Sequence, residues 1–355
     1  MVSDMLFYKQ AKQLIENFMK GNETMEYINV RGLDKPVPKL IFGTAWFSLD
    51  AEEEAHKMMD LYVEKGGTMI DTGRYYGKGN GIAKSEEILD RWLRSTKVKR
   101  EDIMISDKCC NCLIDRKGHL HEEFVRVSPT FIQEDLMYSL DRVGVDYFDL
   151  YLIHRDDPHV PVEALMDKME ELRIAGYFKA FGVSSWQPSR LKEALDYCKR
   201  MNYRGPSVSS PEYSLVHAQY NRWPGTWYAD DEYAQWHKEN NVSLFAWAAQ
   251  GAGFFVDPLL PAYDPETAPM MTKESFLTEE NFERRKRALE LAKVRGCSGT
   301  NIALAYVLSQ DLPLAAQIGP QNQWELEDCI RAMEEIKLSQ AEIEYLQLKR
   351  ETWED

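Results

Sequence analysis

The sequence has little of what marks secreted or membrane proteins. It contains only six cysteines in 355 residues, too few and too unevenly spaced for the disulfide framework of a small secreted domain. No apolar run approaches the roughly 20 residues that span a bilayer. The N-terminus has neither a basic segment ahead of an apolar stretch nor a small-residue cleavage site. We therefore expect a cytoplasmic protein with reduced thiols and no membrane association.

Basic charge is also scarce. The chain has 43 Lys and Arg against 58 Asp and Glu, a net charge of -15, and no basic run. Phosphate backbones and anionic lipids would be repelled, which argues against a nucleic-acid partner. Cys109, Cys110 and Cys112 could bind a metal together with His119 or His121, but they lack a paired C-x-x-C spacing, so we favour thiols and predict no metal site.

What the sequence does have is a regular alternation of short β-rich runs and helical patterns. Alternation of this kind predicts an α/β fold with a parallel sheet, and eight units predict a closed (β/α)8 TIM barrel. A doubly wound sheet would want G-x-G-x-x-G after its first strand, and Gly43–Trp46 has no such pattern. The expected strands are Leu40–Ala45, Thr68–Asp71, Asp102–Lys108, Tyr147–His154, Ala180–Ser184, Ser207–Tyr213, Val242–Trp247 and Leu314–Ile318. The expected helices are 52–65, 85–95, 130–143, 162–176, 188–202, 230–240, 299–309 and 323–336.

Two segments frame the predicted barrel. Residues 1–24 carry apolar side chains at helical spacing and predict an N-terminal helical extension. Tyr27–Val30 and 36–40 predict a short hairpin around Gly32. We expect residues 25–355 to form a single barrel domain with a C-terminal helix.

Met69–Leu93 is the stretch around which this pattern is organised, because it reads as a strand, a glycine-rich loop and a helix. Asp71 ends the strand and Tyr76 lies in the loop. The simplest interpretation is structural, with an acid capping the loop and a ring packing over it. In a barrel, however, chemistry belongs at the C-terminal ends of the strands, where Lys108 and His154 are also expected. An Asp, a Tyr, a Lys and a His on one rim form a set that can move protons.

At this point the chain resembles the aldo-keto reductase family, from about residue 25 to 331. The motifs that carry the resemblance are G-T-A-W at Gly43–Trp46, D-T-G-R-Y-Y-G at Asp71–Gly77, I-S-D-K at Ile105–Lys108, D-L-Y-L-I-H-R at Asp149–Arg155, G-V-S-S-W at Gly182–Trp186, P-E-Y-S-L at Pro211–Leu215 and I-G-P-Q-N-Q-W-E-L-E at Ile318–Glu327. Their order and positions, more than any one motif, make the likeness specific.

The resemblance implies a catalytic tetrad of Asp71, Tyr76, Lys108 and His154. Such an enzyme interconverts a carbonyl and an alcohol, with hydride from a nicotinamide and a proton from Tyr76. A phenol has a pKa near 10, and a neighbouring ammonium lowers it; we expect Lys108 to do so, held charged by Asp71. His154 would hydrogen-bond the substrate oxygen.

The resemblance also implies a nicotinamide site, in which several residues depart from the family pattern. Trp247 matches the aromatic that stacks on the nicotinamide, whereas Ser185 and Ser210 stand where amides or an arginine are usual. Gln321 replaces a cation that would pair a ribose 2′-phosphate, which favours NAD(H) over NADP(H) unless a distant cation such as Lys273 substitutes. The full set of expected cofactor residues is Thr44, Asp71, Ser184, Ser185, Ser210, Trp247, Ala248, Gln250, Gly251, Gly319, Gln321, Glu325, Asp328 and Cys329.

Aromatic residues crowd the predicted loops that would select the substrate. Trp46, Trp223 and Trp227 are expected to form the wall beside Tyr76 and His154, and a small carbonyl or sugar-like molecule would suit such a wall. Other aromatics in these loops are Tyr220, Tyr228, Phe254 and Phe255. The alternative is that the aromatics pack the loops down onto the body.

Two rival functions fit parts of the sequence. Glu212 and Asp71 could act as the paired carboxylates of a glycoside hydrolase, although this leaves Lys108, Tyr76 and Trp247 unexplained. A nicotinamide-binding regulatory or scaffold protein, like the potassium-channel β subunits of the resembled family, would suit the N-terminal extension. A homo-oligomer is compatible with either.

Overall fold

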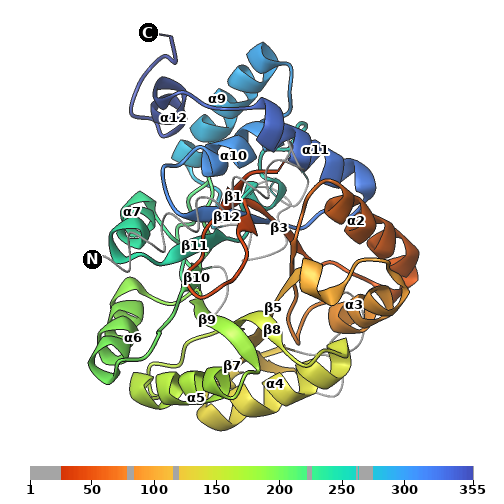
Figure 1. Ribbon diagram of the computed structural model, residues 1–355. Helices are drawn as coiled ribbons and strands as arrows, with labels where there is room; N and C mark the ends of the chain where they lie inside the picture. Colours follow the sequence, from red (N-terminus) through yellow and green to blue (C-terminus); the bar gives the residue numbers. More distant parts are fainter. Residues whose placement is uncertain are drawn as a thin grey trace, which may run out of the picture.

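A computed structural model describes residues 25–77, 84–114, 120–221, 226–260, 263 and 275–354, without the side chains of 112–114 and 120–125. The predicted N-terminal helix at 1–24 lies outside these ranges. Eight parallel strands form a closed barrel in the order β10-β11-β12-β3-β4-β5-β8-β9, with helices around it (Figure 1). The barrel strands are β3 (Leu40–Gly43), β4 (Met69–Asp71), β5 (Met104–Cys109), β8 (Phe148–Ile153), β9 (Phe178–Ser184), β10 (Val208–Ser210), β11 (Ser243–Ala246) and β12 (Leu314–Ile318). The predicted (β/α)8 barrel is confirmed.

Alternating side chains divide the barrel into an interior and an outer layer. Ile41, Met104 and Phe245 belong to a buried cluster inside the barrel. A small hairpin of β1 (Tyr27–Ile28) and β2 (Val37–Pro38) packs on this same cluster through Val30 and Val37, and it lies across the viewed end of the barrel in Figure 1. The predicted hairpin therefore closes the N-terminal end, which leaves the opposite rim for chemistry.

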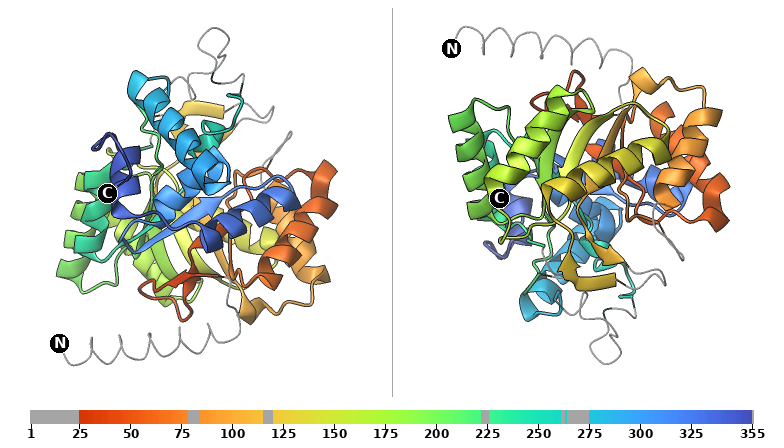
Figure 2. Two further views of the ribbon diagram at one scale, coloured as in Figure 1. Left: turned by 90° about the horizontal axis from the view of Figure 1, so that it is seen from above. Right: turned by 90° about the horizontal axis from the view of Figure 1, so that it is seen from below.

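The outer ring contains the eight predicted helices, each within two residues of its expected ends. They are α2 (Glu52–Glu64), α3 (Lys84–Ser95), α4 (Pro129–Val143), α5 (Val162–Ile174), α6 (Pro188–Met201), α7 (Asp231–Asn240), α10 (Gly299–Leu308) and α11 (Gln323–Glu335). Local chemistry sets several of the starts, because the side chains of Ser128, Asp230 and Ser298 accept hydrogen bonds from first-turn N–H groups. Figure 2 shows the same helices from above and from below the view of Figure 1.

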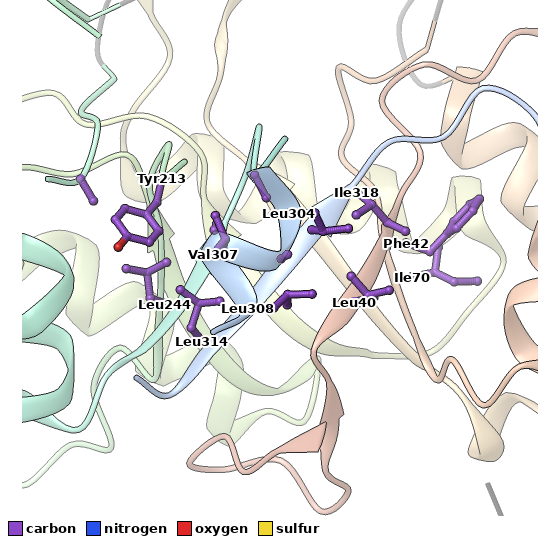
Figure 3. Packing of buried hydrophobic residues seen from close by; sticks show 14 of the residues in the cluster. Leu40, Phe42, Ile70, Tyr213, Leu244, Leu304, Val307, Leu308, Leu314 and Ile318 are labelled. Atoms are coloured by element: carbon purple, nitrogen blue, oxygen red, sulfur yellow. The ribbon is translucent and has the colours of Figure 1, made fainter. Parts of the chain in front are cut away.

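The outer layer of the core is apolar. Helix α10 is apolar almost all round, and Leu304, Val307 and Leu308 lie close to the β12 residues Leu314 and Ile318 (Figure 3). A helix buried on every side needs no polar face. In the described ranges, no helix combines the length and apolar character that crossing a bilayer would require.

Several elements were not expected from the sequence. Helix α9 (Glu279–Arg295) is rich in charge and buries only a narrow stripe around Leu291, so its apolar period is faint. Strands β6 (Cys112–Ile114) and β7 (Leu120–Val125) pair antiparallel within what was predicted as a loop. Short 3-10 turns occur at η1 (Leu49–Ala51), η2 (Arg100–Asp102) and η3 (Gly251–Gly253). The last helix, α12 (Gln340–Leu346), is by contrast the expected C-terminal helix.

Candidate active site

A buried ion pair lies at the C-terminal rim of the barrel. Asp71 ends β4 and Lys108 lies near the end of the neighbouring β5, and their side chains are almost completely buried. The Lys108 Nζ donates to Asp71 Oδ2 at 2.5 Å and to the Thr72 carbonyl at 2.9 Å. Burial alone would lower the pKa of Lys108, but the charges of Asp71 and Tyr76 outweigh it and raise that pKa. Lys108 is therefore an ammonium at neutral pH.

Tyr76 lies beside this ammonium. Its backbone N–H donates to the Gly73 carbonyl at 2.8 Å in a tight turn, and the Lys108 Nζ lies 4.6 Å from the ring centroid. Burial raises the pKa of Tyr76, and Lys108 only partly opposes that rise. The direction expected from the sequence was a lowered pKa; desolvation of the phenolate is the larger effect here, so Tyr76 keeps its proton at neutral pH.

His154 completes the set from the end of β8. Its ring meets the Tyr76 ring edge-on with centroids 5.6 Å apart. Burial, and then the charges of Arg155 and Lys108, hold the pKa of His154 well below its usual range, so the imidazole is neutral. Its Nδ1 lies 3.3 Å from the amide nitrogen of Asn111. An amide N–H₂ in this position donates to Nδ1, an arrangement that goes with a neutral ring carrying its proton on Nε2.

Asn111 is a site residue that the sequence did not single out. It follows Cys110, which has φ of 59°, a left-handed conformation that turns the chain sharply after β5. The turn places the buried Asn111 amide against His154. In the sequence, the only feature that could have pointed to Asn111 is its position between two cysteines at the end of a strand.

Four of the expected cofactor residues are brought together across β9, β10 and β11. Ser184 Oγ donates to the Ser210 carbonyl at 3.0 Å, and the indole N–H of Trp247 donates to Ser185 Oγ at 3.2 Å. Ser185 has φ of 60°, which turns its hydroxyl out of the strand direction. The Trp247 indole is thereby fixed at the rim.

Gln317 on β12 joins this group and was not predicted. Its Oε1 accepts from Ser210 Oγ at 2.9 Å, and its side chain lies on the interior face of a strand whose neighbours Ala316 and Ile318 pack outward. An amide therefore reaches Ser210, the position where the sequence departs from the family by lacking one.

The remaining expected cofactor residues form two further groups. Thr44 Oγ1 bonds the Asp71 carbonyl at 3.2 Å and the Thr72 hydroxyl at 3.0 Å, which places Thr44 beside the ion pair. On the other side, Gln250 lies 3.7 Å from the Cys329 sulfur, and Ala248 and Gly251 both have positive φ.

The last expected cofactor residues lie in the first turns of α11 and in the segment just before it. The Gln321 N–H donates to Glu325 Oε2 at 2.8 Å, and Asn322 Nδ2 donates to its other oxygen at 3.0 Å. A side chain on Gly319 would touch Trp46 at 3.0 Å. Asp328 is held by Asn301 at 2.7 Å. Lys273, the alternative cation, lies outside the described residues.

The aromatic residues divide between wall and core. Trp46 is 56% exposed, and Trp227 stacks on Tyr228 with centroids 6.4 Å apart. The backbone of Glu212 forms isolated β-bridges with Tyr228 and with Trp247. The segment that contains Trp227 therefore lies next to the rim. Trp223 lies outside the described residues.

Phe254 and Phe255 are fully buried. Phe254 packs with Tyr263 and Phe276. For these two rings the alternative interpretation applies, because they pack the loop down onto the body.

The structure also bears on the metal-site and glycoside-hydrolase alternatives. No group of three metal-ligating side chains exists in the part of the chain that the structure describes; Cys109 and Cys110 are buried, and burial raises the pKa of the Cys109 thiol well above its usual range. The side chains of Cys112, His119 and His121 are not described. Asp71 is neutralised by Lys108, which makes it a poor second carboxylate for a hydrolase.

The residues fit a nicotinamide nucleotide. Three features lie at the rim of the barrel. They are the fixed indole of Trp247, the buried amide of Gln317, whose nitrogen has no partner among the described residues, and the neutral His154 beside the protonated Tyr76. These groups offer a stacking face and amide hydrogen bonds next to a proton donor, which a planar ring bearing a carboxamide needs.

Comparisons with known proteins agree with this geometry. A family model described as the Aldo/keto reductase family matches residues 39–351. YrpG of Bacillus subtilis, named an uncharacterized oxidoreductase, is 24% identical over 311 residues, 87% of this chain and 91% of the relative. An aldo-keto reductase named yakc [NADP(+)] of Schizosaccharomyces pombe is 25% identical over 317 residues, 86% of each chain. A probable voltage-gated potassium channel subunit beta of Arabidopsis thaliana is 24% identical over 290 residues, 81% of each chain.

Proposed function

Since the chain belongs to the aldo/keto reductase family, we propose that it is an oxidoreductase that interconverts a carbonyl compound and an alcohol with a nicotinamide nucleotide. The observation that carries the proposal is the Lys108 ammonium, which is bonded to Asp71 and lies 4.6 Å from the ring centroid of Tyr76. A structural ion pair alone would not need a half-buried tyrosine and a neutral imidazole beside it.

The side chains have separable roles in reduction. The bound nicotinamide supplies the hydride. Tyr76 enters the reaction protonated and gives its proton to the carbonyl oxygen, and Lys108 then stabilises the phenolate. Asp71 keeps Lys108 charged and directed. His154, with its proton on Nε2, donates a hydrogen bond that orients the same oxygen. Oxidation of an alcohol uses these steps in reverse.

The nucleotide would lie along the groups described at the rim. Trp247 would stack on the nicotinamide, with Ser184, Ser185 and Ser210 near its carboxamide. Ala248, Gln250, Gly251, Gly319, Asp328 and Cys329 would follow the rest of the molecule, with Thr44 at the base of the site. We propose NAD(H) rather than NADP(H), because the Glu325 carboxylate occupies the Gln321 N–H and its charge would repel a 2′-phosphate. The S. pombe relative carries NADP(+) in its name, and that name applies to that protein.

The substrate we propose is a small polar carbonyl compound, sugar-like in size. Trp46 and Trp227 supply flat apolar surfaces near the rim, and Tyr76 and His154 supply the two hydrogen bonds to the reacting oxygen. Trp223 belongs to the same proposed wall.

The test has a binding arm and a turnover arm. Wild-type protein is titrated with NADH and with NADPH while tryptophan emission is followed, and a panel of aldehydes, ketones and sugars is then assayed. Tyr76→Phe should lower kcat by about 10²- to 10⁴-fold and leave nucleotide affinity unchanged. Tyr75→Phe is the matched control, because Tyr75 bonds Arg126 and should keep its turnover.

Two results would decide against catalysis. Full turnover in Tyr76→Phe would remove the phenol from the mechanism. Tight nucleotide binding with no turnover on any substrate would instead favour a nicotinamide-binding regulatory role; the Arabidopsis relative is named a probable voltage-gated potassium channel subunit beta.

A further inference from the structure

The side chain of Gln317 has no structural task that uses its whole amide. It lies inside the barrel on β12 and is 9% exposed. Its Oε1 accepts from Ser210 Oγ across the intervening strand β11, while its Nε2 is buried without a partner among the described residues. Most buried side-chain polar atoms have at least one hydrogen-bond partner. An open hydrogen bond at this place therefore points to a ligand.

We infer that the Gln317 amide binds the carboxamide of the nicotinamide, in place of the amide that position 210 lacks. The inference rests on the proposed function and assigns to β12 a contact that neither the sequence motifs nor the resemblance placed there. Ser210 is too short to reach a ligand as a glutamine would. Instead its hydroxyl holds the end of Gln317, and the long side chain comes from a different strand.

Both orientations of the Gln317 amide leave one end open to a ligand. Oxygen and nitrogen of a glutamine are exchangeable in assignment. If they are exchanged, Nε2 donates to Ser210 Oγ and Oε1 becomes the open group. In both orientations one end is bonded to Ser210 and the other is open. A carboxamide carries both a donor and an acceptor, so it can pair with either.

The surroundings select the nicotinamide over other parts of a nucleotide. Ser210 also joins Gln317 to Ser184, whose hydroxyl donates to the Ser210 carbonyl. Ser185, next in sequence, holds the Trp247 indole. The open amide therefore belongs to the same bonded group as the stacking face, and the hydrogen bonds that link Gln317, Ser210, Ser184, Ser185 and Trp247 join neutral groups. A neutral, planar, amide-bearing ring suits this environment better than a phosphate.

The experiment compares two ligands that differ only in the nicotinamide. Dissociation constants for NADH and for ADP-ribose are measured by calorimetry on the full chain of wild type, Gln317→Met and Gln340→Met. Methionine matches the length of glutamine without its amide, and Gln340 is an exposed residue of α12 that serves as the control. Gln317→Met should bind NADH about tenfold more weakly, the loss of one or two hydrogen bonds, with ADP-ribose affinity within twofold of wild type.

Each alternative result has one meaning. Unchanged NADH affinity in Gln317→Met, with wild type binding NADH, overturns the inference and leaves the proposed function intact. Equal weakening of both ligands also overturns it, because the defect would then be in the barrel and not at the carboxamide. Failure of wild type to bind NADH and NADPH, while its thermal unfolding shows a folded protein, removes the proposed function and this inference with it.

Discussion

The carboxyl groups of Glu86 and Asp107 face each other in a layer that solvent does not reach, directly behind Lys108. Glu86 lies on α3 and Asp107 on the outer face of β5, and Asp107 Oδ1 accepts the Lys108 N–H at 2.5 Å. The Ser139 hydroxyl of α4 lies beside them, and Arg74 and Arg142 favour the ionised form of Glu86. Burial raises the pKa of Glu86, and burial together with the charge of Glu86 raises that of Asp107 well above its usual range. Two neighbouring carboxylates in such a layer do not readily ionise together.

We predict that this pair holds one proton at neutral pH and makes the fold less stable as pH rises. The unfolded chain loses both protons above about pH 4, whereas the native pair keeps one until pH passes its raised pKa, so stability falls across that interval. Glu86→Gln replaces the carboxylate whose charge helps to raise the pKa of Asp107 with a neutral amide. The loss of unfolding free energy between pH 5 and pH 8 should shrink by about 1 kcal/mol or more, measured by urea denaturation. The exposed Glu101→Gln is the control, and an unchanged slope in Glu86→Gln would contradict the shared proton.

Lys108→Met should abolish turnover and also destabilise the fold. It leaves the Asp71 carboxylate buried without its cation, which typically costs about 3–5 kcal/mol. Asp71→Asn combined with Lys108→Met removes both charges and should recover most of the stability but none of the activity. Denaturation midpoints and turnover of the wild type and the two variants test this. A double variant no more stable than Lys108→Met would show that the pair is not the source of the loss.

His237 should make the fold sensitive to acid. It is fully buried in α7, its Nδ1 lies 2.7 Å from the Tyr233 carbonyl, and its Nε2 has no partner among the described residues. Burial lowers its pKa to about 4. The unfolded chain takes up a proton near pH 6.5 and the native state does not, so stability is lost as pH falls from 6.5 towards 4, by about 3 kcal/mol in total.

His237→Asn keeps a donor for the Tyr233 carbonyl and removes the titration. Its unfolding free energy should therefore fall less than that of wild type between pH 7 and pH 4.5. His159→Asn, at an exposed histidine, should follow the wild-type curve. If both variants behave alike, acid sensitivity arises elsewhere, with His154 as the next residue to examine.

Glu325 should control the choice between the two nucleotides. Its carboxylate caps the Gln321 N–H and bonds the Asn322 amide. Glu325→Gln combined with Gln321→Arg removes the repelling charge and adds a partner for a 2′-phosphate. The ratio of NADPH to NADH affinity should rise at least about tenfold, equivalent to about 1.4 kcal/mol. Wild type that already prefers NADPH would contradict the proposed NAD(H) preference.

The sequence by itself determined the architecture. Eight apolar runs of strand length alternate with eight helical patterns, and that alternation is a local property, because strand and helix periods appear in neighbouring residues. The strand ends at Asp71, Lys108 and His154 followed from the same counting, since parallel strands in a barrel bring their C-terminal ends to one rim. Helix α9 was not predicted because its many charged residues obscure the narrow apolar stripe that it buries.

Tertiary structure decided which side chains meet. Asn111 reaches His154, Gln317 reaches Ser210 and Glu86 faces Asp107 only because barrel closure and helix packing bring together strands and helices that lie far apart in the chain. It also decided the direction of the Tyr76 pKa, because that depends on how much water the fold removes from the phenol, a quantity set by neighbours on several strands and not by the residue's own segment.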